Sequence, residues 1–336
     1  MKKITTIAFA LAVVLNVNAQ KQKGQEKHKN ATELDLKKDI KVTSKGVVKK
    51  SKGMALAKVA LEFKTISKNS VYIGKGQKTS KSSAYAILGG VSEATMQSIA
   101  DEFAASFTKK LEALNIPVKD WSTITSSEKW EKVTSKQIDK IYQKQEEGLM
   151  EIFTANNGPH TKQVVGNMGI WGAYAKLGKD IGANPVTLDV VIDFANFNMS
   201  LKKSVSSTGY FDNKEYTTTY ASNANVFPQI SIETDNGGAG FNLLTTNMTV
   251  IGKYGEASII TLNKNVLFNG AYATSVDAYN GKMPTQMKKK ISFGQGMSVG
   301  TFIIQANEAA YKKAVLDALD IYSDYIIEKI RLIRTK

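Results

Sequence analysis

The chain has 336 residues, of which 42% are hydrophobic and 22% are charged, and its 45 basic and 30 acidic side chains give a formal net charge of +15. These proportions are ordinary for a globular protein, and the length suffices for one large domain or two of ordinary size. The sequence contains no cysteine, which excludes disulfide bonds, thiolate catalysis, cysteine-bound metals and a lipid-modified N-terminal cysteine.

Residues 1–19 are expected to form a secretory signal peptide. Lys2 and Lys3 supply the positive start, an apolar run extends to Val17, and Ala19 ends a small-residue cleavage site. The apolar run is shorter than the roughly 18–20 residues that a membrane-spanning helix needs, so cleavage is favoured over anchoring. We therefore expect an exported protein, periplasmic or extracellular and without a lipid anchor, for which nucleic acid is not a partner.

Residues 20–53 are polar and rich in lysine, with almost no aromatic side chain. Low hydrophobicity together with an excess of one charge predicts a flexible arm. Such an arm can dock on an anionic surface, for example phospholipid or a cell-wall polymer, or it can be a solvated spacer. The sequence leaves both interpretations open.

Ordered structure is expected to begin at Met54. From residue 57 to residue 64, apolar side chains alternate with Lys58, Glu62 and Lys64, which predicts a half-buried strand. A loop rich in lysine, serine and glycine (67–83) leads to a second predicted strand at 85–88.

The best-marked element is a helix that begins after Ser92. Ser92 can cap the first turn, Asn115 tolerates a left-handed end, and Pro117 cannot extend a helix. The apolar side chains at spacings of three and four are Met96, Ile99, Phe103, Phe107, Leu111 and Leu114. With a short strand after it, the stretch 85–121 has the plan of one βαβ unit.

Residues 127–154 are predicted to be helical, as one helix or two, because Trp130, Val133 and Ile152 approximate a helical stripe. Residues 156–185 contain six glycines and little periodicity, so a connection made mostly of loops is expected. His160 lies in this connection and is interpreted as a surface residue rather than a metal ligand.

The chain becomes β-rich from 186 to 293, with runs rich in threonine, isoleucine, valine and aromatic residues between turn signals. Residues 199–210 and 214–226 can pair as a long hairpin about Asp212-Asn213. Their polar composition offers no clean apolar face, so membrane insertion of this hairpin is not favoured. A closing helix is predicted for 307–330, with Asn307 as its cap.

Sequence motifs give no catalytic, cofactor-binding or metal-binding residue. Gly296 to Gly300 matches G-x-S-x-G, but no histidine follows Ser298, so a glycine-rich turn is favoured over a nucleophile elbow. Residues 73–79 have the wrong spacing for a phosphate loop. Asp189 and Asp193 share one strand face, but a pair of catalytic acids cannot be recognised from such spacing alone.

Two stretches resemble the N-terminal part of the curli assembly and transport (CsgG-type) family: KVALEFKTI and ILGGVSEATMQSIADEFAASFTKKLEALNIPVKDW. The β-rich segment and terminal helix also follow that family's order. The resemblance implies an oligomeric, outer-membrane-associated secretion assembly without enzymatic activity. The chain departs from the family in having no cysteine for lipidation and no apolar hairpin, which favours a soluble relative of the family's periplasmic domain.

We therefore predict an α+β protein: a mixed sheet with amphipathic helices on one face and a β-rich C-terminal half closed by a long helix. Residues 54–185 are interpreted as the α/β region of a CsgG-like periplasmic domain, and 186–336 as the β-rich region of the same domain. We expect no cofactor.

The expected function is non-enzymatic: an envelope or secreted protein that acts through protein–protein contacts, by self-association or with other envelope proteins. The setting would be an outer-membrane-associated assembly or a secretion complex. The alternative is a secreted module that binds an acidic ligand, either a glycan or an anionic lipid. A third possibility, an enzyme that uses carboxylates alone, requires a cleft with two close acids.

Overall fold

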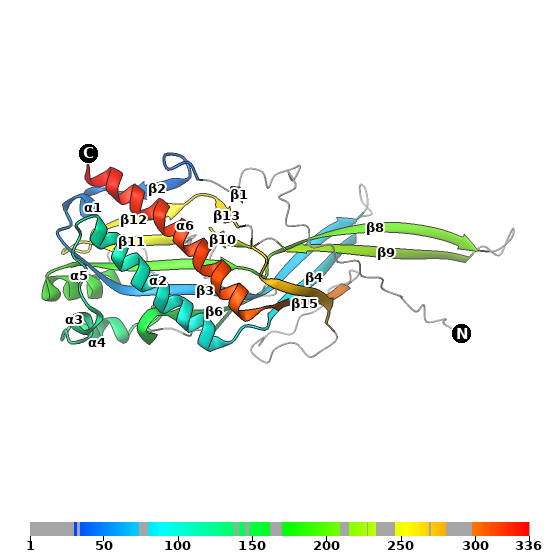
Figure 1. Ribbon diagram of the computed structural model, residues 1–336, viewed down its shortest axis with the longest axis horizontal. Helices are drawn as coiled ribbons and strands as arrows, with labels where there is room; N and C mark the ends of the chain where they lie inside the picture. The colour runs from blue at the N-terminus through cyan, green and yellow to red at the C-terminus, as the bar shows by residue number, and fades with distance from the viewer. Residues whose placement is uncertain are drawn as a thin grey trace.

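The structure is a computed structural model, and the residues that it describes are 30–31, 34–73, 80–137, 139, 141–144, 148–161, 170–208, 215–226, 228–232, 246–268, 270–279 and 298–335. The expected signal peptide and the tip of the expected hairpin at Asp212-Asn213 lie outside these residues. The loop predicted for 67–83 is wrong for 67–73 and 80–83, which belong to two paired strands, and its residues 74–79 are not described. The described part of the chain confirms the α+β fold class, with long helices and a mixed sheet (Figure 1).

Thirteen of the described strands form one mixed sheet, and two more form a separate hairpin. The strands of the large sheet are β1 (Asn30–Ala31), β2 (Ile40–Thr43), β3 (Met54–Ile73), β4 (Ser80–Gly89), β5 (Ile141–Lys144), β6 (Gly148–Thr154), β7 (Asn184–Asp193), β10 (Gln229–Ser231), β11 (Asn247–Ile251), β12 (Ala257–Leu262), β13 (Asn265–Leu267), β14 (Ala273–Ala278) and β15 (Ser298–Ala306). The hairpin consists of β8 (Phe197–Thr208) and β9 (Glu215–Val226). The helices are α1 (Gly46–Lys50), α2 (Glu93–Ala113), α3 (Trp121–Thr125), α4 (Trp130–Thr134), α5 (Ile170–Ile181) and α6 (Glu308–Arg334), with a short 3₁₀ turn η2 (Ala155–Asn157).

Strand β3 is 20 residues long, and its two halves pair with different strands. Its residues 60–63 pair with β6 on one edge and with β7 on the other. Ile66 pairs with both Ile87 of β4 and Leu149 of β6, so β4 takes over from β7 along the same edge. The first half of β3 therefore lies in the body of the molecule, and the second half runs out of it with β4 (Figure 1).

The prediction of a strand at 57–64 is confirmed, but the prediction that it is half-buried is wrong. Lys58 and Glu62 are only 3% and 1% exposed, because the second face of the sheet is covered as well. A register shift between Leu56 and Lys58 opposite β7 marks a β-bulge. Ala57 consequently packs in a second apolar cluster with α3, α4 and α5, and not with Val59.

Helix α2 agrees with the sequence signals that predicted it. The Ser92 side chain accepts a hydrogen bond from the Thr95 backbone N–H, and Asn115 has a positive φ of 56°. The βαβ plan is wrong in its last part, because Val118 makes only an isolated bridge, parallel to Met54 of β3. The parallel neighbour of β4 is instead β15, from the far end of the sequence.

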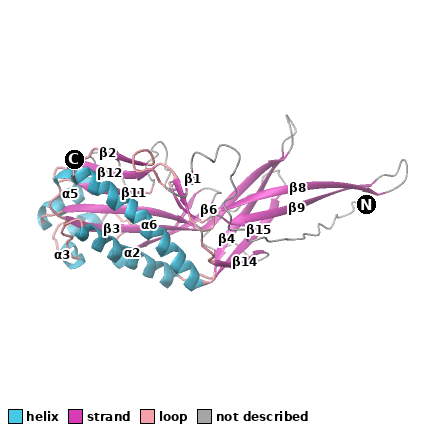
Figure 2. Cartoon of the chain, turned by 45° about the horizontal axis from the view of Figure 1, so that its top comes forward, coloured by secondary structure: helices cyan, strands magenta, loops and turns pink. Residues whose placement is uncertain are grey.

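Helix α6 also forms where it was predicted. Its cap is Asn307, whose side chain accepts a hydrogen bond from the Ala310 N–H at 2.9 Å. The two long helices α2 and α6 pack side by side against the same face of the sheet (Figures 1 and 2). The α6 side chains that enter the core include Tyr311, Val315, Leu319, Tyr322, Ile326 and Ile330.

The helix predicted for 127–154 is wrong beyond α4, because 141–144 and 148–154 are the strands β5 and β6. Strand β6 pairs with β3 and buries side chains on both faces, so its apolar residues show no strand-like alternation. The loop predicted for 156–185 contains α5. Its glycines obscured the helix, yet Gly178 is required there, because a Cβ would lie 2.5 Å from the Pro185 ring.

The flexible arm predicted for 20–53 is wrong for residues 34–53. Strand β2 pairs with β12, and Ile40, Val47 and Val48 are buried in the main core. The guanidinium of Arg334 ties this segment to the end of α6 by donating to the Ser51 carbonyl at 2.7 Å. A few apolar side chains among many lysines are therefore enough to hold 34–53 against the core. Residues 20–29 and 32–33 of the predicted arm lie outside the described residues.

The long hairpin predicted in the β-rich half is confirmed. Strands β8 and β9 pair without a register break, from Phe197 opposite Val226 to Thr208 opposite Glu215. The glycine-rich turn predicted at 296–300 is wrong for Ser298 and the residues after it, because they belong to β15.

Candidate functional site

The two faces of the central sheet carry opposite kinds of side chain. On β3 and β7, Leu61 and Val190 point into the main core beneath α2 and α6. The alternate residues Lys58, Glu62 and Asp189 point to the other face, yet they are at most 3% exposed. A buried charged side chain requires partners to offset its lost hydration, so these residues and their partners form a candidate site.

Lys58 and Asp189 form an ion pair between neighbouring strands. The Lys58 Nζ atom lies 2.6 Å from Asp189 Oδ1, and the two side chains are 1% and 2% exposed. The same ammonium donates a hydrogen bond to the Thr161 carbonyl oxygen at 3.0 Å. Two acceptors from different segments therefore hold the Lys58 charge.

His160 joins this pair, so the prediction that it lies on the surface is wrong. It is 2% exposed, and one ligand atom each of Glu62, His160 and Asp189 lie within 4.8 Å of one another. The backbone brings it there through Asn156 and Asn157, whose positive φ values of 57° and 50° reverse the chain after β6.

Tyr174, on helix α5, contacts the segment that carries His160. Its hydroxyl lies 3.1 Å from Thr161 Oγ1. Burial, and to a smaller extent the charge of Asp189, raise the pKa of Tyr174 well above its usual value, so the phenol stays neutral. We name Lys58, Glu62, His160, Asp189 and Tyr174 the buried charge cluster.

A second ion pair lies further along the same face. Lys64 Nζ is 3.1 Å from Asp193 Oδ2, and the Ser67 hydroxyl donates to Asp193 Oδ1 at 3.3 Å. The Lys64 side chain is 24% exposed, so this pair reaches solvent where the Lys58 pair does not. Asp189 and Asp193 do share a strand face, as predicted, but a different lysine holds each of them.

The buried charge cluster has the donor types of a metal site, with a lysine ammonium beside them. A histidine and two carboxylates suit a divalent transition metal. However, the Lys58 ammonium already occupies the cationic position beside Asp189. The Lys58 contacts join β3 to β7 and to the 158–161 segment within the body of the molecule.

Sequence reasoning missed Lys58 and Glu62 as members of this cluster. The available signal was the presence of charged residues within strands that are otherwise apolar, on β3 and again on β7. The sequence signal does not reveal that β3 and β7 are parallel neighbours with Ala60 opposite Asp189.

A second candidate site is the end of the molecule where strands leave the body. Hairpin β8–β9 extends away from the large sheet, and residues 68–73 of β3 run out beside it with β4 (Figure 1). Near its base, the hairpin accepts a hydrogen bond at the Phe197 carbonyl from the Asn69 side chain. Among the described strands, β8 and β9 pair only with each other, so each has one edge without a backbone partner.

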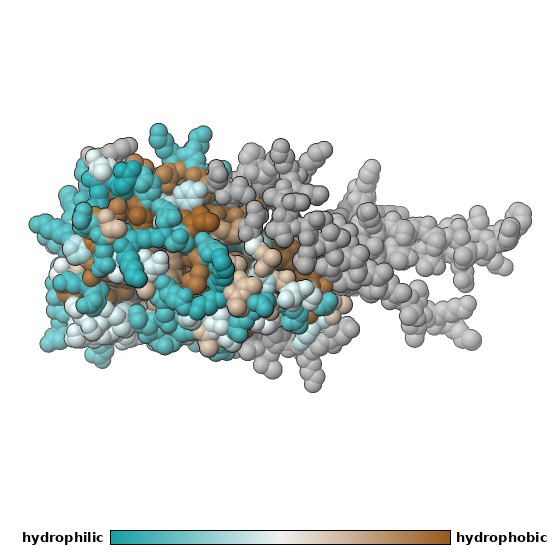
Figure 3. Space-filling view, in the orientation of Figure 1, coloured by the Kyte–Doolittle hydropathy of each residue, from teal (hydrophilic) through white to brown (hydrophobic). Residues whose placement is uncertain are grey.

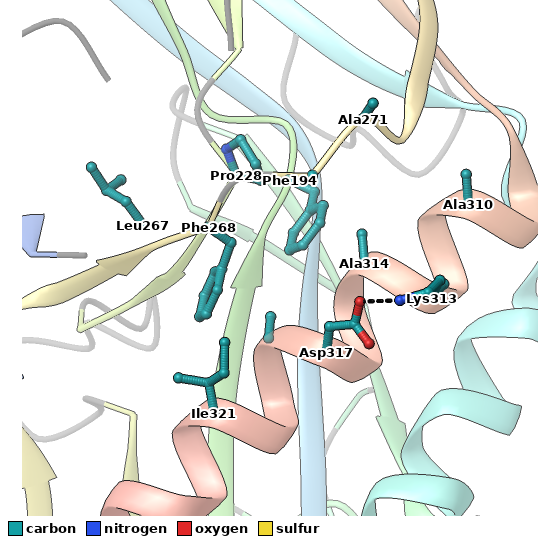
Figure 4. A pocket seen from close by; sticks show the side chains of 12 residues that line it. Phe194, Pro228, Leu267, Phe268, Ala271, Ala310, Lys313, Ala314, Asp317 and Ile321 are labelled. Atoms are coloured by element: carbon teal, nitrogen blue, oxygen red, sulfur yellow. Dashed lines mark hydrogen bonds and ion pairs between the residues drawn. The ribbon is translucent and has the colours of Figure 1, made fainter. Parts of the chain in front are cut away.

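A third feature is an apolar cavity of about 470 Å³ between α6 and the strands β10 and β13. Figure 4 shows Phe194 and Phe268 directed toward the helix, and Ile321 below them on α6. Ile321 is 43% exposed, which is unusual for so large an apolar side chain in this protein. An ion pair between Lys313 and Asp317 lies at the polar margin of the cavity.

Comparison with known proteins finds no match to this chain among family models, curated proteins or solved structures. Of the helices within the described residues, none has the length and apolar character needed to cross a membrane.

Proposed function

We propose that this protein is a non-enzymatic, exported component of an envelope-associated or secretion assembly, and that it acts through protein–protein contacts, foremost with copies of itself. The observation that carries the proposal is the projecting hairpin β8–β9, with 12 paired residues on each strand and an open edge on each side. The resemblance to a family of oligomeric secretion proteins gives independent support.

An isolated two-stranded hairpin is marginally stable in water, and an open strand edge is a template for another strand. The hairpin here is longer than a typical strand of about 5–6 residues, so many backbone groups face outward along its edges. A neighbouring copy can satisfy them by adding its own strand, which is a known mode of protein recognition. Identical copies that repeat this contact head to tail close into a ring.

The proposal is tested by light scattering after size-exclusion chromatography of the mature chain. The sharpest variant replaces residues 201–222 with Asn-Gly, which retains the pairing of Ser200 with Asn223 and closes the shortened strands with a tight turn. We expect the parent to elute as an oligomer and the shortened protein as a monomer, with the circular dichroism of the body preserved. A parent that is monomeric at every concentration, or a shortened protein with unchanged mass, refutes the proposal.

A second candidate function is recognition of an acidic ligand. It is supported by the net charge of +15 and by a cavity that four lysines surround, at the end of the body away from the hairpin. This function does not require self-association, and it can coexist with it.

A further inference from the structure

The lysine-lined cavity has a volume of about 660 Å³ and is built from three segments that are distant in sequence. The end of α1 and the residues after it contribute Lys50 and Lys52, helix α5 contributes Lys179, and the turn between β11 and β12 contributes Lys253. Figure 3 shows hydrophilic side chains over this end of the body. The volume lies within the range of small-molecule sites, about 300–1,000 Å³.

Asn184 fixes the three segments relative to one another. Its backbone N–H donates to the Gly53 carbonyl at 2.9 Å, and its side-chain amide donates to the Ile251 carbonyl at 2.9 Å. Both bonded residues line the cavity, as does Asn184 itself. The cavity wall is therefore tied to the start of β7 and does not depend on flexible surface segments.

The charge of the cavity is one-sided. Four lysines line it against a single acid, Glu256, whose carboxylate accepts a hydrogen bond from the Tyr254 N–H at 3.0 Å. Within the described residues, none of these four lysines forms an ion pair, whereas other surface lysines such as Lys110 and Lys312 do. Ammonium groups gathered around a concave surface produce a positive potential that attracts anions.

Tyr254 lies beside two of the lysines that line the cavity. It is 76% exposed, and the Nζ atoms of Lys253 and Lys179 lie 4.8 and 5.2 Å from the centre of its ring. Cation–π attraction therefore holds two of the lining ammonium groups beside one exposed ring.

We propose that this cavity binds a small ligand that carries phosphate groups. Lysine ammonium groups bind phosphate as compact point charges, and the four that line the cavity suit a ligand with several negative charges. The inference rests on the second candidate function and is independent of self-association. It also revises the expected anionic contact of residues 20–53, because Lys50 and Lys52 present their charges from a folded wall.

Isothermal titration of the full mature chain with inorganic triphosphate tests the site. We expect 1:1 binding that weakens as salt is added. The double variant Lys50→Glu/Lys253→Glu should bind about tenfold more weakly or worse. The matched control Lys37→Glu/Lys109→Glu changes net charge equally at exposed positions outside the lining and should stay within about twofold of the parent.

A second variant blocks the cavity without changing its charge. A Cβ added to Gly46 meets no atom within 4 Å, so Gly46→Trp can fill the cavity without strain at the backbone and should also abolish binding. Phosphatidylglycerol vesicles that compete with triphosphate, when phosphatidylcholine vesicles do not, identify a lipid headgroup as the source of phosphate. Failure of competition identifies a soluble phosphorylated ligand.

The proposal is overturned if neither triphosphate nor phosphatidylglycerol vesicles bind, or if the control weakens binding as much as the cavity variants do. The shortened hairpin protein separates the two proposals. It should bind triphosphate with the parent's affinity even if it is monomeric, and loss of self-association with retained binding leaves the cavity assignment intact.

Discussion

On the face of the sheet beneath α2 and α6, β3 and β7 contribute side chains such as Leu61 and Val190, while on the opposite face the same strands contribute Lys58 and Asp189. Both sets of side chains are buried, so the two faces do not differ in solvent exposure. The apolar side chains stabilise the folded state in proportion to the apolar area that folding removes from water. The charged set loses the free energy of its hydration, and only the ion pairs and hydrogen bonds with its partners offset that loss. The two faces should therefore respond to substitution by different rules.

The largest effect is expected where the charged face loses one partner. Lys58→Met leaves Asp189 buried with no cation and the Thr161 carbonyl without its donor. We expect the free energy of unfolding in urea to fall by about 3–5 kcal/mol. Lys64→Met is the control, because that pair reaches solvent and Ser67 still donates to Asp193, and its loss should be clearly smaller.

The double variant Lys58→Met/Asp189→Leu distinguishes the cost of a lone charge from the value of the pair. Because both charges are then removed, we expect most of the lost stability to return. If the double variant is as unstable as Lys58→Met, the pair itself contributes the stability and the proposed difference between the faces is wrong.

On the apolar face, the expected loss depends on volume instead of partnership. Leu319 of α6 is 1% exposed in the main core, so Leu319→Ala should lower the free energy of unfolding by about 2–5 kcal/mol, and we expect a value near the middle of that range. Leu319→Met is the matched control, since it preserves the volume and should cost less than about 1.5 kcal/mol. Equal losses for the two variants would contradict a volume rule.

The apolar face contains buried hydroxyl groups without a hydrogen-bond partner within the described residues, on Tyr311 and Tyr322, and they sharpen the comparison. The Tyr322 hydroxyl is buried and has no hydrogen-bond partner within the described structure, and burial raises its pKa far above the usual value. Tyr322→Phe removes this atom without opening a cavity. We therefore expect urea stability to rise by about 1 kcal/mol, whereas Tyr272→Phe should lower it, because the Tyr272 hydroxyl donates to the Phe194 carbonyl.

The apolar face was largely predictable from sequence and the charged face was not. Helices α2 and α6 carry local signals, namely the caps Ser92 and Asn307 and apolar residues at spacings of three and four. The hairpin β8–β9 was likewise predicted from two strand-like runs and the turn signal between them. Each of these signals lies within one segment of the chain.

The elements that were missed depend on contacts between distant segments. Strand β6 resembles a helix by its spacing and becomes a strand through pairing with β3, where Thr65 donates to Glu151, 86 residues away. His160 is buried because the chain reverses at Asn156 and Asn157, which have positive φ values. A hydrophobic periodicity in the sequence does not reveal such a reversal. The composition of 34–53 is mostly polar, and this concealed its four buried apolar residues, Leu34, Ile40, Val47 and Val48.

The smallest expected effect concerns a carboxylate that joins the two helices of the apolar face. Glu308, in the first turn of α6, accepts hydrogen bonds at the start of α2 from the Ser92 hydroxyl at 2.5 Å, the Thr95 hydroxyl at 2.7 Å and the Ser92 N–H at 2.9 Å. These hydrogen bonds lower the pKa of Glu308 from 4.5 to about 2. A pKa lowered by folding stabilises the protein above the unfolded value, and this contribution is lost as the pH falls from 4.5 toward 2.

Glu308→Gln should therefore flatten the dependence of urea stability on pH between these two values, while Glu112→Gln, at an exposed position on α2, leaves that dependence unchanged. Because Glu308 is at the surface, the effect should be modest and should not approach the losses expected for Lys58 or Leu319. An unchanged pH profile in Glu308→Gln would mean that the Glu308 hydrogen bonds add nothing measurable to the contact between α2 and α6. That contact would then rest on its apolar side chains and on ion pairs such as Lys312 with Glu102.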